Sequence, residues 1–233
     1  MSEVSVLFNG YSIIKDENEM IANCTCTLIK AESLNIIIDT MTPWDSDKIV
    51  NALMAHQLTA KDINYVISTH GHSDHTGNNN LFLEAKHLVG FSLSYKDTYF
   101  MHPFDKGEEL KLNENIRIIP TPGHTLSDVT VIVTTGDGTY AITGDLFEKY
   151  EDIEDPTIWV DAGSEDQLKQ AKNRSMIADI ADWIVPGHGP MFKVTQEIRE
   201  ALKREIQLLL TREKQHVLEI HRDRWFSSKI EQK

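Results

Sequence analysis

The sequence contains only two cysteines, Cys24 and Cys26, which are separated by a single residue. On a strand, their Cα atoms would lie roughly 6.6 Å apart, which is near the upper limit for a disulfide. We therefore expect two free thiols, which is in keeping with a reducing compartment. Neither cysteine falls in the ligand motifs described below, so a metal site built from those motifs would contain only nitrogen and oxygen donors.

Long apolar runs are absent. No stretch approaches the roughly 20 residues that a helix needs to cross a bilayer. The first residues, Met1–Val6, lack the basic and apolar segments of a secretory signal. These features predict an intracellular protein, in the cytoplasm, the nucleus or both, that does not associate with membranes.

Positive charge is scarce, because 36 Asp and Glu residues outnumber 23 Lys and Arg residues and leave a formal net charge of −13. Residues 193–233 hold ten basic and seven acidic residues, so residues 1–192 carry −16. Such a body repels long polyanions unless metal ions or local basic groups intervene. The more basic end of the chain could guide RNA, although alternating charges on a solvated helix explain it as well.

Ligand-type side chains are concentrated in His70-Gly71-His72-Ser73-Asp74-His75, which has three imidazoles and one carboxylate in six residues. The preceding residues, Ile63–Thr69, are β-branched and aromatic and predict a buried strand. The cluster therefore follows the end of a strand, where α/β proteins often hold their chemistry. We interpret it as a candidate metal site.

Three further ligand-type residues occupy similar settings, each at the end of an apolar run or inside a Gly/Pro turn: His124, Asp145 and His188. The glycines beside them allow the backbone to turn tightly around a buried ion. The remaining histidines have no such setting and are expected at the surface or in the core: His56, His87, His102, His216 and His221.

Hydrophobic periodicity predicts two β-rich halves, each flanked by helices. The predicted strands are Val4–Ile14, Cys24–Lys30, Leu34–Asp39, Ile63–Thr69, Lys86–Gly90, Asn115–Pro120, Val129–Thr135, Thr139–Gly144 and Trp183–Val185. The predicted helices are Pro43–Gln57 with Thr42 as its cap, a short helix after Thr76, Glu165–Asp179, and a long helix from Thr195.

This pattern predicts an α/β fold in the form of a four-layer αβ/βα sandwich, with the metal site at the seam between two sheets. We expect one domain over residues 1–233, in which residues 194–233 form a C-terminal helical tail.

The motifs resemble those of the metallo-β-lactamase-fold hydrolase superfamily, which has them in the same order. The resemblance implies two metal ions per chain. One ion would be held by His70, His72 and His124, and the other by Asp74, His75 and His188. Asp145 would bridge them, and Asp74 and Asp145 are the residues expected to take part in catalysis.

These donors suit Zn²⁺ best, and iron and manganese remain open. Two such ions about 3.5–4 Å apart would lower the pKa of a shared water towards roughly 7 and so supply a bridging hydroxide as nucleophile. The same site serves esters, thioesters, lactams and phosphodiesters. It therefore predicts hydrolysis without selecting the substrate.

Two neighbouring features belong to the same prediction. Asp39, which ends the apolar run Ile36–Ile38, resembles the superfamily's aspartate that orients a ligand histidine, although Met41 stands where many relatives have glycine. The acidic segment Glu148–Asp166 contains Trp159. It could form a rim over the metals or a solvated loop whose tryptophan covers a helix.

Longer phrases resemble one group of this superfamily, the metallo-β-lactamase domain-containing protein 1 group. They are Thr69–His75, Gly144–Glu148 and Ala181–Phe192, together with Trp159 and Ser164–Asp166. The resemblance implies an endoribonuclease that acts on the 3′ ends of histone pre-mRNA, with RNA as its partner. A homodimer remains open.

Other functions stay open at this point. A thioester hydrolase resembling glyoxalase II would use the same two ions, with the terminal helix as a reduced substrate domain. An iron site made by His70, His124 and Asp145 alone would resemble persulfide dioxygenases. A non-catalytic binding module is disfavoured, because it has no need of Asp74 as a ligand of a second ion.

Overall fold

Two β-sheets form the centre of the computed structural model, which describes residues 2–230 and, at 213 and 216–230, the backbone alone. The first sheet has seven strands in the order β1(Glu3–Phe8), β4(Cys26–Ala31), β5(Leu34–Ile38), β6(Tyr65–Ser68), β7(Lys86–Val89), β8(Ser92–Tyr95) and β9(Thr98–Phe100). The second has six, in the order β10(Leu110–Lys111), β11(Ile116–Pro120), β12(Val129–Thr135), β13(Gly138–Gly144), β14(Trp183–Pro186) and β15(Phe192–Lys193).

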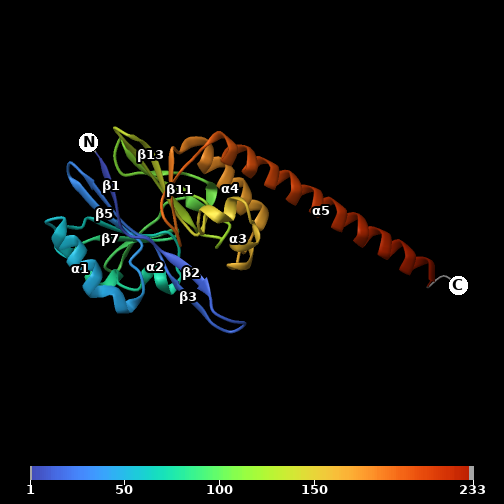
Figure 1. Cartoon of the computed structure of the whole chain (residues 1–233), viewed down its shortest axis with the longest axis horizontal. Helices are drawn as coiled ribbons and strands as arrows, with labels where there is room; N and C mark the ends of the chain where they lie inside the picture. The colour runs from blue at the N-terminus through green and yellow to red at the C-terminus, as the bar shows by residue number, and fades with distance from the viewer. Residues whose placement is uncertain (1, 231–233) are drawn as a thin grey trace.

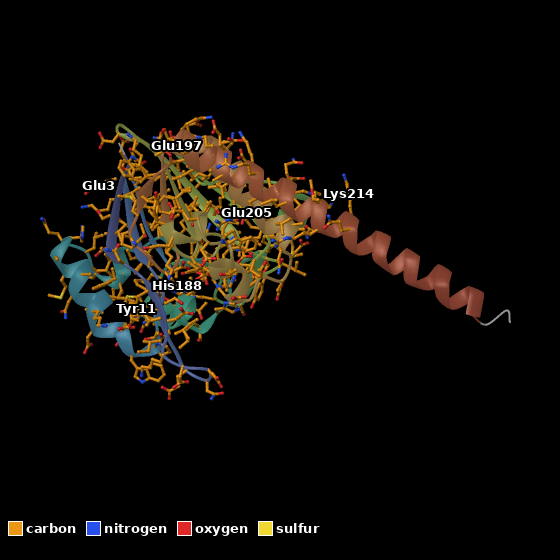
Figure 2. The ribbon with its side chains drawn as sticks, turned by 45° about the vertical axis from the view of Figure 1, so that its right-hand side comes forward. Glu3, Tyr11, His188, Glu197, Glu205 and Lys214 are labelled. Carbon is orange, nitrogen blue, oxygen red and sulfur yellow. The ribbon has the colours of Figure 1, made fainter. Side chains whose placement is uncertain are left out.

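Helices cover the outer faces of both sheets, so the sandwich has four layers (Figure 1). The helices are α1(Ser46–Ala55), α2(Ser73–Thr76), α3(Thr157–Asp161), α4(Gln167–Ile180) and α5(Gln196–Ile230). The start of α5 packs on α4, and the helix then extends away from the body, as the positions of Glu197 and Lys214 show (Figure 2). Among the described residues, no helix is both long and apolar enough to span a bilayer.

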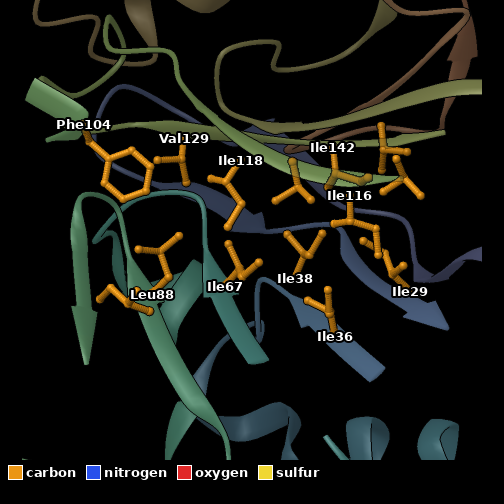
Figure 3. Packing of buried hydrophobic residues seen from close by; sticks show 14 residues of the cluster. Ile29, Ile36, Ile38, Ile67, Leu88, Phe104, Ile116, Ile118, Val129 and Ile142 are labelled. Carbon is orange, nitrogen blue, oxygen red and sulfur yellow. The ribbon is translucent and has the colours of Figure 1, made fainter. Parts of the chain in front are cut away.

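The main core lies between the two sheets (Figure 3). Ile36, Ile38 and Ile67 of the first sheet face Ile118 and Ile142 of the second sheet, and all five are buried. Because helices cover the outer faces, the strands are apolar on both sides and read as continuous hydrophobic runs.

The outer layers are packed in the same way. Ile37 points away from the inner core and meets Ile49 and Leu53 of α1, while Ile177 of α4 and Ile198 of α5 pack on the second sheet. This arrangement confirms the predicted four-layer fold with a C-terminal helix.

Several predicted elements need correction in detail. The predicted strand Val4–Ile14 divides into β1 and β2(Tyr11–Ile14), and β2 pairs with β3(Met20–Asn23) in a separate hairpin. The predicted strand Cys24–Lys30 begins later, as β4 at Cys26. The short helix expected after Thr76 is a 3₁₀ helix at Asn79–Leu81, and the α-helical turn α2 before it ends at Thr76.

The start of the first long helix also differs from the prediction. A 3₁₀ turn occupies Pro43–Asp45 before α1, and Thr42 makes no side-chain capping bond to the backbone. Its hydroxyl donates instead to the carboxylate of Asp45. That carboxylate also binds Lys48 and the side-chain amide of Asn23, so it joins β3 to the start of the helix.

The turn after β5 takes an uncommon backbone path. Asp39 has φ +55° and Met41 has φ +58°, which is the left-handed region that favours glycine. Met41 adopts this conformation with a side chain that is buried against α1 and β4. The turn brings Asp39 to the edge where the metal-ligand motifs meet.

Candidate metal centre

The structure brings all seven predicted ligand residues together at one edge of the sandwich. Each follows the end of a strand: the cluster 70–75 follows β6, His124 follows β11, Asp145 follows β13 and His188 follows β14. The segments after β13 and β14 lie so close that a Cβ at Gly187 would overlap the Asp145 carboxylate. Glycine is therefore required there to let the two ligand segments meet.

His70, His72, His124 and Asp145 form one group of ligand-type atoms. The His72 Nδ1 atom lies 2.9 Å from His70 Nε2 and 3.1 Å from His124 Nε2. Asp145 Oδ2 lies 3.6 Å from His70 Nε2 and 3.4 Å from His124 Nε2. Ligands of a tetrahedral ion, each about 2.0–2.2 Å from it, are separated by comparable distances.

Asp74, His75 and His188 form a second group beside the first. The Asp145 carboxylate joins the two, since its Oδ1 lies 3.2 Å from His75 Nε2 and its Oδ2 lies 3.3 Å from His188 Nε2. Asp74 Oδ2 lies 3.9 Å from the Nε2 atoms of both His75 and His188. In the structure, Asp145 therefore lies between the histidines of the two groups.

Groups behind the histidines fix the direction of their rings. The Asp39 carboxylate lies 3.0 Å from His75 Nδ1 and accepts a bond from the Thr69 backbone N–H at 2.8 Å. On His188, Nδ1 lies 3.0 Å from the carbonyl oxygen of Asn23 and 3.2 Å from that of Tyr11. Both contacts are made by Nδ1–H, so Nε2 of each ring, which is turned towards Asp145, is the atom that can bind a metal ion.

Burial and charge shift the pKa values of these groups in the ion-free protein. Burial, aided by the neighbouring His75, lowers the pKa of His70, and burial also lowers that of His124. Burial opposes protonation of His188 too, but Asp145 outweighs it and raises the pKa of His188 to about 9. Burial would raise the pKa of Asp145, but the surrounding histidines hold it well below the usual range.

The donor set fits divalent ions. The buried His75 Nε2 and Asp145 Oδ1 atoms make no regular hydrogen bond, although they face one another across the site. Leaving such atoms without a partner costs free energy, and a cation between them would remove that cost. His70, His72, His124 and Asp145 would hold one ion, and Asp74, His75 and His188 would hold the other together with Asp145.

Two residues near the site were missed by the sequence reasoning. Asp128, which precedes β12, is buried with its Oδ1 3.7 Å from His70 Nδ1. Burial raises its pKa to about 8. Glu148 is buried beside His188. For Asp128 the only sequence signal was a charged residue next to an apolar run, whereas Glu148 also begins the acidic segment for which a rim over the metals was considered.

A cavity of about 370 Å³ opens onto the two groups. The β2–β3 hairpin forms one side through Ser12, Met20 and Ala22, and Glu148 and Ala162 lie on another. No lysine or arginine of the described residues lines it. Figure 2 shows Tyr11 of this hairpin beside His188.

The segment after Asp145 combines both predicted roles. Glu148 and Ala162 reach the cavity as a rim, whereas Trp159 is fully buried and its indole N–H donates to Glu205 of α5 at 2.9 Å. The segment therefore borders the site and also covers a helix.

The other histidines and the cysteines lie outside the proposed ligand sets. His87 and His102 contact the backbone carbonyls of Phe82 and Glu108, and the side chains of His216 and His221 fall outside the described residues. Cys24 and Cys26 are free, as predicted, and both are buried. Cys24 lies near Asp39 and His75, but burial raises the pKa of its thiol, which disfavours the thiolate that binds metals.

Residues 21–188 match the sequence profile of the metallo-β-lactamase superfamily. Together with the four-layer fold and the clustered histidines and aspartates, this match establishes that the chain belongs to that superfamily. The protein is accordingly a metal-dependent hydrolase by class.

Individual proteins of this superfamily are similar to the chain in sequence or in fold. The chain is 39% identical over 194 residues to metallo-β-lactamase domain-containing protein 1 of Xenopus laevis, covering 82% of this chain and 81% of that protein. It is 39% identical over 165 residues to the Homo sapiens protein of the same name, of which the alignment covers only 60%. A putative metallo-β-lactamase from Thermotoga maritima has the same fold, with a TM-score of 0.63 at 21% identity over 82% of this chain and 99% of that one.

Proposed function

We propose that the protein is a dinuclear metal-dependent endoribonuclease that cleaves single-stranded RNA, with pre-mRNA 3′ ends such as those of histone transcripts as the substrate class. The observation that carries the dinuclear centre is the Asp145 carboxylate, which lies within 3.6 Å of four histidine nitrogens drawn from both ligand groups. Two divalent ions held there would supply a water that ionises near neutral pH and would polarise the scissile bond.

The chain's own residues prepare the site for this chemistry. Asp39 and the carbonyls of Tyr11 and Asn23 hold the Nδ1 protons of His75 and His188, so both Nε2 atoms are available as donors. The cavity, of about 370 Å³, has room for a small part of a polymer.

Exposed aromatic side chains beside the cavity favour RNA as the substrate. Trp44 is 87% exposed and lies two residues beyond Thr42, which lines the cavity. Tyr11 is half exposed on the hairpin next to His188 (Figure 2). Proteins bind unpaired bases by stacking them on such aromatic rings.

Basic side chains give less support for phosphate binding than the sequence suggested. Arg199 donates to the carbonyl oxygens of Ala178 and Ala181, and Lys203 pairs with Asp179 at 2.9 Å. Both side chains are therefore already bound to residues of α4 or to Ala181 just after it. Attraction for the scissile phosphate would come mainly from the ions, which offset the carboxylates in the cavity.

A thioester hydrolase is the second candidate, and one observation favours it. Ile13, Ile14 and Met20 of the β2–β3 hairpin are all more than half exposed, and Met20 lines the cavity. An apolar wall of this kind suits an acyl chain.

A substrate panel separates the two candidates. Zinc-reconstituted protein would be assayed with labelled single-stranded RNA, S-acylglutathione and a lactam, and the proposal expects cleavage of RNA. Trp44→Ala should weaken RNA binding about 5- to 150-fold, which corresponds to roughly 1–3 kcal/mol per stacked base, while Tyr99→Ala on the distant strand β9 should leave it unchanged. Efficient thioester turnover without RNA cleavage would move the assignment to the second candidate.

A further inference from the structure

Glu148 is a buried carboxylate that the seven-residue ligand set does not include. Its side chain is only 3% exposed, yet it lies on the wall of the cavity that opens onto the two ligand groups. Its Oε1 atom has no hydrogen-bond partner, and Oε2 lies 3.9 Å from His188 Nε2. A buried carboxylate oxygen without a partner is costly, so a further charged group is expected to face it.

The backbone around Glu148 is held firmly. Its N–H donates to Asp152 Oδ2 at 2.7 Å, and its carbonyl accepts from the N–H of His188 at 2.7 Å. Asp152 is itself fully buried and paired with Arg174 of α4 at 2.7 Å. The backbone that carries the Glu148 carboxylate is therefore fixed, which suits a metal ligand better than a mobile gate.

The distances around His188 allow Glu148 to share its ion. Two ligands that each lie about 2.0–2.2 Å from one ion can be no more than about 4.4 Å apart. The oxygens of Asp145, Asp74 and Glu148 lie 3.3, 3.9 and 3.9 Å from His188 Nε2. Asp145, Glu148 and His188 offer ligand atoms that all lie within 4.8 Å of one another, while Asp74, His75 and His188 form a separate group of this kind. Glu148 would therefore reach the ion from the side of His188 and Asp145.

We infer that Glu148 is an additional ligand of the ion held by Asp74, His75 and His188. The inference rests on the proposed dinuclear centre and gives its two halves different chemistry. The first ion would have three imidazoles and the shared Asp145, which suits zinc. The second would have two imidazoles and three carboxylates, and such an oxygen-rich set shifts preference towards a harder ion such as Mn²⁺.

Metal competition tests this assignment without an activity assay. Metal-free protein would be dialysed against a fixed concentration of Zn²⁺ with rising concentrations of Mn²⁺, and the metal content per chain would be measured by elemental analysis. Zn²⁺ binds nitrogen and oxygen ligands more tightly than Mn²⁺ in general, so wild type should bind two ions and exchange one of them for Mn²⁺ at a lower excess of Mn²⁺ than the other. Glu148→Gln should keep the first ion and bind the second about 10- to 100-fold more weakly. Glu154→Gln, an exposed residue of the same segment, should behave as wild type.

Glu148→Asp distinguishes a ligand from a nearby charge, because it keeps the charge and withdraws the carboxylate by one methylene. A ligand role predicts weaker binding of the second ion in this variant also. Two tightly bound ions with unaltered metal preference in both Glu148 variants would overturn the assignment and leave the dinuclear centre intact. Binding of a single ion by wild type would overturn both.

Discussion

At the scale of single residues, three of the proposed ligand histidines have a polar group next to Nδ1 that fixes the direction of the ring. Asp39 contacts His75 Nδ1, Asp128 lies near His70 Nδ1, and two backbone carbonyls contact His188 Nδ1. Such partners fix the tautomer of the ring and raise its basicity as a ligand. Their loss should therefore appear as a loss of metal affinity.

Asp39→Asn tests this effect on one ion. An amide has no negative charge to hold the Nδ1 proton of His75, so we expect affinity for the second ion to fall about 10- to 100-fold with little effect on the first. Titration against a chromophoric chelator measures both affinities. Asp137→Asn, in an exposed turn, is the control. Unaltered affinity in Asp39→Asn would show that Asp39 serves the fold alone.

The seven candidate ligand residues could be identified because each stands in a short local motif, and five of them have glycine beside them: His70, His72, His124, Asp145 and His188. Glu148 and Asp128 could not be recognised in the same way. Glu148 was identified only as the start of a possible rim, and nothing local distinguishes Asp128 from a surface acid. The burial of both residues depends on contacts with segments far away in the chain. Residues whose role depends on tertiary contacts could therefore not be recognised from the sequence alone.

At the scale of elements, the β2–β3 hairpin is tied to the start of α1 by Asp45. The Asp45 carboxylate accepts from Asn23 at 2.8 Å and from Thr42, and Lys48 lies 2.6 Å away. Burial works to raise the pKa of Asp45, but the bonds from these three side chains outweigh it and lower that pKa. The interaction therefore stabilises the fold when Asp45 is ionised.

This shift predicts a pH-dependent stability difference between wild type and Asp45→Asn. A lowered pKa in the folded state means that the stabilisation is complete above the unfolded pKa of about 3.9 and is lost as the pH falls through the folded value. We expect Asp45→Asn to lose about 1 kcal/mol in free energy of unfolding near pH 7 and the difference to shrink below about pH 4. Urea unfolding of both proteins between pH 3 and 7 measures it. A difference that widens in acid would contradict the direction of the shift.

Helices and strands could be predicted where apolar periodicity is strong, but not where tertiary contacts determine the local structure. Strand β12 begins and ends where predicted, since Val129–Thr135 is an apolar run buried between layers. Strands β8 and β9 were missed, because their short, partly exposed sequences carry no strong pattern. The residues after Thr76 do not continue a helix, because the Asn78 side chain bonds to the carbonyls of Thr40 and Thr42.

At the scale of the whole molecule, charge limits how RNA can be bound. Residues 1–192 carry −16, and the cavity lining contains carboxylates and no described lysine or arginine. Long-range attraction for a polyanion is therefore weak. If the proposed substrate is correct, contacts at the metal centre and stacking on aromatic rings must provide most of the affinity.

The salt dependence of RNA binding measures this balance. Each neutralised phosphate of a single strand contributes about −0.7 to the log–log slope of affinity against salt, and we expect a slope of only about −2 to −3. Asp145→Ala, assayed in parallel, should lose cleavage while retaining part of the binding. A slope steeper than about −6 would reveal an extended basic surface that is at odds with the structure.

The metal content of the chain tests the central claim most directly. Protein stripped by a chelator, reconstituted with zinc and dialysed should contain two ions per chain by elemental analysis, while His188→Ala should retain about one, because only the second ion loses a ligand. One ion in both proteins would contradict the dinuclear centre. A single iron accompanied by oxygen uptake would instead favour a mononuclear site of His70, His124 and Asp145.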